Sequence, residues 1–120
     1  MNIFDYDIKR LNFEDYIWII FAVLAFFNIY GDNLQKEFLK TNDKNYEKKA
    51  NDVFLLVLIV GFFIYLYFFY RNYRIFLKTK EEDKRLFIIK LIGSALLISG
   101  SMCLIYFQYK QTDFIGTPGI

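Results

Sequence analysis

The sequence contains no histidine, one cysteine and one proline among its 120 residues. Without histidine, and with its only thiol at Cys103 inside an apolar stretch, the chain lacks a zinc site and the common catalytic dyads and triads. It has no glycine-rich phosphate loop, and no pair of carboxylates lies inside an apolar stretch, where a proton relay would need one. We therefore expect no catalytic residue, no cofactor, no metal site and no intrachain disulfide.

A strong charge of one sign is also missing. The net charge is +2, and basic residues are interleaved with acidic ones along the chain, so we expect no nucleic-acid partner. Apolar residues instead make up 56% of the sequence, which is more than a soluble domain of this length can bury. The surplus is expected to face the lipid bilayer.

Three apolar runs contain no charged residue, namely Tyr16–Tyr30, Val53–Tyr70 and Leu91–Phe107. The second and third approach the ~20 residues that a transmembrane helix needs. The first is shorter and reaches only about 22 Å as a helix, so a helix buried against the other two is its alternative; aromatic residues at its ends favour insertion. The sequence predicts an all-α integral membrane protein with three transmembrane helices and short amphipathic interfacial segments.

We predict one domain with seven consecutive segments: an interfacial leader at 1–12, a first span at 13–31, an external connector at 32–52, a second span at 53–74, a cytoplasmic connector at 75–85, a third span at 86–109 and an extended tail at 110–120. The leader is acidic, and no small-residue cleavage site follows the first span, so we expect that span to be retained. A polar break is expected at residues 41–43.

Local signals refine these boundaries. Asn12 and Asp15 resemble a helix start, and Gly31 is expected to end the first helix. Thr79 and Glu82 have the spacing of a capping box before the third helix.

The second half of the second span is aromatic and is followed by arginines. This order is typical of a membrane boundary, where aromatic rings and basic side chains meet the headgroups. A ligand-facing cage formed by Tyr65, Tyr67 and Phe68 is the alternative interpretation.

The third span alone combines small and polar residues. Its predicted helix-packing face consists of Lys90, Gly93, Ser94, Leu97, Gly100 and Ser101. Small residues on one side of a helix allow close approach of another helix in lipid. Lys90 is the one charge embedded in an apolar sequence, and we hypothesise an ion pair with Glu14 or Asp15; the alternative is that its ammonium extends to lipid phosphate and water.

Basic residues in the leader and in the connector between the second and third spans outnumber those on the other side by eight to six. Arg71, Arg74 and Arg85 lie directly at span ends, where the positive-inside bias acts. We expect a cell membrane, the bacterial plasma membrane, with a cytoplasmic N-terminus.

The leading hypothesis is a non-enzymatic membrane protein that acts by helix association with another membrane protein or with further copies of itself, as a subunit, adaptor or scaffold. The alternative is a homo-oligomeric pore, holin-like or channel-like, lined by Lys90, Ser94, Ser99 and Ser101. A third hypothesis is an enzyme that acts on lipid through acids and lysines of the connectors.

We assign the sequence to no family. Its size and three-span layout are similar to those of bacterial diacylglycerol kinases and three-span phage holins. The acidic catalytic clusters of the former and the strongly basic tail of the latter are missing, since the tail carries only Lys110.

Overall fold

Three long helices form the protein in a computed structural model that describes residues 3–111 and 114–116. They are α1 (Ile3–Thr41), α2 (Lys44–Lys78) and α3 (Lys84–Lys110), with a 3₁₀ turn, η1 (Glu81–Asp83), before α3. Each of the three long helices is long and apolar enough to cross a membrane. The described part of the chain contains no strand, so the predicted all-α class with three membrane-spanning helices is confirmed.

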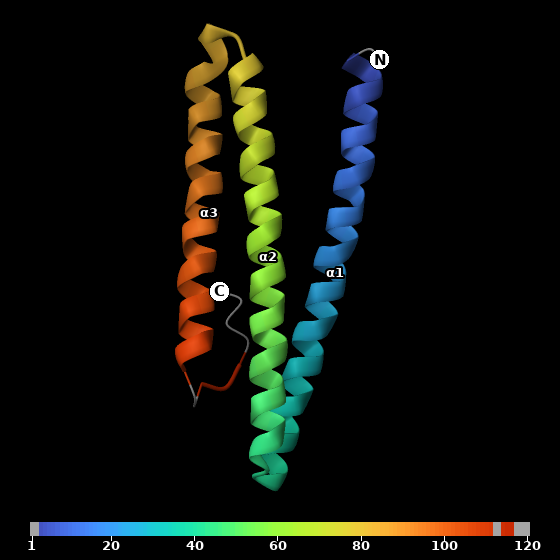
Figure 1. Cartoon of the computed structure of the whole chain (residues 1–120), viewed down its shortest axis with the longest axis vertical. Helices are drawn as coiled ribbons and strands as arrows, with labels where there is room; N and C mark the ends of the chain where they lie inside the picture. Colours follow the sequence, from blue (N-terminus) through green and yellow to red (C-terminus); the bar gives the residue numbers. More distant parts are fainter. Residues whose placement is uncertain (1–2, 112–113, 117–120) are drawn as a thin grey trace.

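The helices form a flat layer in which α2 is central. Within the described residues α2 packs against both α1 and α3, whereas α1 and α3 do not contact each other. The molecule measures 59 × 26 × 14 Å along its principal axes, and its shortest dimension is close to the diameter of one helix. Figure 1 shows α1 diverging from α2 toward the N-terminal end, which is also the end of the α2–η1–α3 connection.

Helix α1 runs without interruption through several predicted boundaries. Asn12 lies inside the helix and does not cap it, and Gly31 does not end it. Gly31 is buried, and an added Cβ would lie only 2.5 Å from Cε1 of Phe54 in α2. The glycine therefore permits close packing of the two helices. The described part of the predicted leader at 1–12 and the first part of the predicted connector at 32–52 both belong to α1.

The polar break predicted at residues 41–43 is confirmed. Helix α1 ends at Thr41, and Asn42 takes a left-handed conformation with φ of 60°, which asparagine tolerates better than most residues. Asp43 then caps α2, because its Oδ1 accepts a 3.0 Å hydrogen bond from the backbone N–H of Asn45. A tight reversal places α2 antiparallel to α1.

The connection between α2 and α3 differs from the prediction. The Thr79 hydroxyl donates to the carbonyl of Ile75, and the Thr79 backbone N–H donates to the carbonyl of Phe76. Thr79 therefore ends α2 instead of capping the next helix, and α3 begins only at Lys84, after η1. The predicted capping box of Thr79 and Glu82 is wrong because the residue has unfilled carbonyls of the preceding helix within reach.

The two helix interfaces differ in chemistry. Two apolar clusters join α1 to α2: Ile17, Leu24 and Ile64 form one, and Leu34, Ala50 and Phe54 form the other. The buried residues of α3 are instead Ser94, Ser101 and Gln108, which recur every seven positions. Helix α3 thus faces α2 with a polar seam, and most of its apolar side chains lie on the outside.

The described part of the predicted extended tail folds back onto the helices. Gln35, buried in α1, accepts a 2.8 Å hydrogen bond from the backbone N–H of Gly116 and donates to the carbonyl of Phe114 at 3.5 Å. The ring of Phe114 packs edge-on against Phe107 of α3. Residue 110 belongs to α3, and residues 112–113 and 117–120 lie outside the described residues.

Candidate functional site: a polar junction of three helices

A cluster of polar side chains, which we call the polar junction, lies where α2 meets both of its neighbours. Its members are Arg10 and Glu14 from α1, Tyr67, Arg71 and Asn72 from α2, and Ser94 from α3. Glu14, Asn72 and Ser94 are buried, with 5, 4 and 9% of their surfaces exposed. Buried polar groups of this kind are costly unless they are paired, so their partners determine what the junction does.

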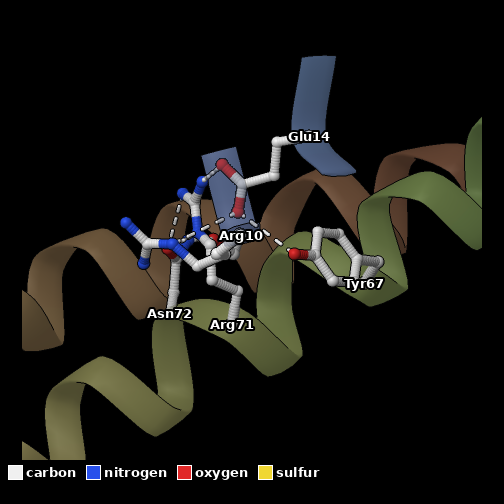
Figure 2. Close-up of polar contacts among 6 residues, drawn as sticks. Arg10, Glu14, Tyr67, Arg71 and Asn72 are labelled. Carbon is white, nitrogen blue, oxygen red and sulfur yellow. Dashed lines mark hydrogen bonds and ion pairs between the residues drawn. The ribbon is translucent and has the colours of Figure 1, made fainter. Parts of the chain in front are cut away.

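Glu14 is the centre of the α1–α2 half of the junction. Its Oε1 accepts a 3.0 Å charge-assisted hydrogen bond from Nη1 of Arg71, and its Oε2 accepts a 3.1 Å bond from the Tyr67 hydroxyl. Arg10, one helical turn earlier, places its Nε 3.8 Å from Oε2. Figure 2 shows the carboxylate pointing from α1 at these groups. Both oxygens are engaged, and the carboxylate is fixed in place by three side chains.

Arg71 and Asn72 carry the junction across to α3. Nε and Nη2 of Arg71 donate to Oδ1 of Asn72 at 3.1 and 2.8 Å. The Asn72 amide then donates to Oγ of Ser94 at 2.7 Å, and that hydroxyl donates to the carbonyl of Lys90 at 3.1 Å. A continuous chain of hydrogen bonds therefore links α1 to α3, although these helices do not touch within the described residues.

Aromatic rings surround the junction on the α1–α2 side. The ring of Tyr67 packs edge-on against Phe13 at 5.2 Å, and Phe68 lies 5.6 Å from the ring of Trp18. The Arg71 guanidinium lies 4.7 Å from the centroid of Phe68, a favourable cation–π arrangement. These contacts limit access of water to the ion pair and fix the Arg71 side chain.

A second polar contact fixes the far end of the α2–α3 interface. The amide group of Gln108, which is 1% exposed, donates to Oδ1 of Asn51, and Gln111 donates to the same oxygen at 2.9 Å. Hydrogen bonds between helices stabilise their association in lipid. The α2–α3 pair is thus held by side-chain hydrogen bonds at two levels, between Asn72 and Ser94 and between Asn51 and Gln108.

The structure divides the predicted helix-packing face of α3. Ser94 and Ser101 are buried against α2, whereas Lys90, Gly93, Leu97 and Gly100 are exposed. An added Cβ at Gly93 or Gly100 would meet no atom within 4 Å. The small residues therefore belong to two sides of the helix, and only the serines contact another helix within the described residues.

The hypothesised ion pair of Lys90 with Glu14 or Asp15 is not formed. Glu14 pairs with Arg10 and Arg71, and Lys90 is exposed with its Nζ 5.9 Å from the ring centroid of Phe87. The physical reason is the helix order, since α2 separates α3 from α1. Arg71, on the intervening helix α2, pairs with Glu14 in place of Lys90.

From the sequence, Arg71 is predicted at a membrane boundary, and Tyr67 is predicted there or in a ligand-facing cage; neither residue is predicted beside Glu14. One signal for this contact was present in the sequence. Glu14 lies at the start of the first span and Arg71 at the end of the second. Because the second span is antiparallel to the first, the two residues lie at a similar depth.

The predicted helix-packing face does not include Gln108, because this residue follows the apolar run Leu91–Phe107. It nevertheless continues the seven-residue spacing of Ser94 and Ser101.

The described contacts of the junction are hydrogen bonds and ion pairs that join neighbouring helices. No described group of three or more histidine, cysteine or acidic residues is arranged to hold a metal ion. The one carboxylate of the junction is already paired on both oxygens.

Comparison with protein-family models, with curated proteins and with solved structures finds no match to this chain.

Proposed function

We propose that this is a non-enzymatic integral membrane protein that acts by helix association, as a subunit, adaptor or self-assembling scaffold. The observation that supports this most is the open, single-layer arrangement in which α3 packs against α2 but not against α1 within the described residues and exposes Gly93 and Gly100. In lipid, helix association depends on close packing, which glycine permits. The exposed face that contains these glycines offers another helix such an approach.

A homo-oligomeric pore is the alternative, and the geometry supports it less. A pore requires a polar stripe that faces a shared axis. Of the four residues expected to form that stripe, Ser94 and Ser101 are buried against α2, which leaves Lys90 and Ser99 exposed. Ion flux into proteoliposomes that contain the purified protein would favour the pore, and its absence would favour the subunit.

The substitution Gly100→Leu tests the association. The added side chain has open space in the single chain, and leucine is a better helix former than glycine, so we expect no loss of thermal stability in the isolated chain but a smaller complex after mild detergent extraction. Ala95→Leu is the matched control, because Ala95 is also exposed and lies about 140° around α3. The mass of the complex, measured by light scattering or native mass spectrometry, is the readout. An unchanged mass in Gly100→Leu would argue against this face.

We further propose the bacterial plasma membrane as the location, with a cytoplasmic N-terminus, on the charge asymmetry of the connectors. In a Cys103→Ser background, Asn45→Cys should react with a membrane-impermeant maleimide on intact cells, and Lys80→Cys should react only after lysis. Both positions are exposed. The reverse pattern would show the opposite orientation.

A further inference from the structure

A groove of about 480 Å³ lies at the polar junction and is lined by all three helices. Its apolar walls are Trp18 and Phe21 of α1, Tyr65 and Phe68 of α2, and Leu97 of α3. Because α1 and α3 do not touch within the described residues, α2 forms the floor between them. The volume lies in the range of sites that hold small ligands.

The groove is polar at one end only. Arg71, Asn72 and Ser94 line it beside the apolar walls. Tyr65 lies six residues before Arg71, or about 9 Å along α2 toward the opposite end of the molecule. Leu97 follows Ser94 in that same direction, because α3 is antiparallel to α2 (Figure 1). The lining therefore changes from a guanidinium, an amide and a hydroxyl to aromatic and aliphatic side chains along one axis.

The polar end carries an excess of positive charge and of hydrogen-bond donors. Arg10 and Arg71 share one carboxylate, that of Glu14. Arg71 uses three of the five N–H donors of a guanidinium in its described hydrogen bonds. Donors without acceptors are costly in a bilayer, and a guanidinium binds phosphate oxygens well.

We propose that this groove binds a phospholipid with a net negative headgroup. Its phosphate accepts hydrogen bonds from Arg71, and one acyl chain extends between Trp18 and Leu97 over Phe68. The direction of the polarity gradient matches a lipid whose headgroup lies at the N-terminal end of α1. In the orientation proposed above, that end faces the cytoplasmic leaflet, where anionic lipids are concentrated.

Lipid retention by the full-length protein tests this proposal. Protein exchanged into detergent with phosphatidylglycerol or phosphatidylcholine is analysed by native mass spectrometry. We expect about a five-fold preference of the wild type for phosphatidylglycerol, which corresponds to one additional cationic contact near the membrane surface. Leu97→Trp should fill the groove and abolish the preference, whereas Leu96→Trp should keep it, since Leu96 is exposed but does not line the groove.

Equal retention of the two lipids by the wild type would overturn the proposal, as would a preference that survives in Leu97→Trp. A reduced complex mass in Leu97→Trp with unchanged lipid preference would also overturn it, because a helix of another copy would then occupy the groove.

A measurement on the wild type does not depend on the folding of any variant. Phosphatidylglycerol with a photoreactive acyl chain should cross-link mainly to segments containing Phe21, Tyr65 or Leu97. Cross-links spread evenly over the exposed helix faces would contradict a specific site.

Discussion

Replacing Arg71 with methionine is expected to lower the free energy of unfolding by about 3–5 kcal/mol, the usual cost of removing one partner from a buried ion pair. Glu14, which is 5% exposed in the wild type, would keep only Arg10, whose Nε lies 3.8 Å away, as a charged partner. Oδ1 of Asn72 would lose both of its donors at the same time. Unfolding of the purified protein in mixed micelles with increasing dodecyl sulfate measures the loss.

Arg74→Met is the matched control for this experiment. Arg74 is on the same helix, is exposed, and contacts the hydroxyl and ring of Tyr70, so its replacement should leave the unfolding transition nearly unchanged. The double variant Glu14→Gln, Arg71→Met should lose less stability than the sum of the single losses, because the second change removes the stranded charge. Equal losses for Arg71→Met and Arg74→Met would show that the ion pair contributes nothing to stability.

The polar junction explains how a flat layer of helices keeps its order. Lipid tails are as apolar as leucine, so apolar side chains do not by themselves drive helices together in a bilayer. Helix α3 offers α2 only serines and a glutamine as buried residues. The hydrogen bond from Asn72 to Ser94 and the contact of Asn51 with Gln108 therefore fix the register of α3.

The number and type of helices could be predicted from the sequence because long uncharged runs admit few alternatives. The break after Thr41 was also predictable, since asparagine and aspartate there favour turns and caps. The role of Gly31 could not be predicted. A glycine can end a helix or allow another helix to pack closely against it. Which of the two occurs depends on a residue far along the chain, here Phe54.

The polar junction was only half predictable. The hypothesis from the sequence pairs Lys90 with Glu14 or Asp15, but the base that lies beside Glu14 depends on which helix lies beside α1; that helix is α2, and the base is Arg71. Of the predicted packing face, Ser94 and Ser101 are buried, whereas Gly93 and Gly100 lie on the exposed side. A helical pattern gives the angle of a residue on its own helix and does not give the direction of the neighbour.

Gly31→Ala is expected to destabilise the α1–α2 interface by about 1–3 kcal/mol, the usual cost of overpacking. The added Cβ would lie 2.5 Å from Cε1 and 2.8 Å from Cζ of Phe54, a fully buried ring packed beside Leu34 and Ala50. Gly100→Ala is the matched control: it meets no atom within 4 Å, so the better helix propensity of alanine should raise stability by about 0.5–1 kcal/mol. Both are measured by the same dodecyl sulfate titration.

A compensating change identifies the cause of the Gly31→Ala loss. Phe54→Leu removes the ring atoms nearest to the added methyl group, so the double variant should be more stable than the sum of the single losses predicts. If Gly31→Ala instead gains stability as Gly100→Ala does, α1 and α2 lie further apart at Gly31 than the 2.5 Å approach requires. In that case helix propensity, and not close packing against Phe54, governs this position.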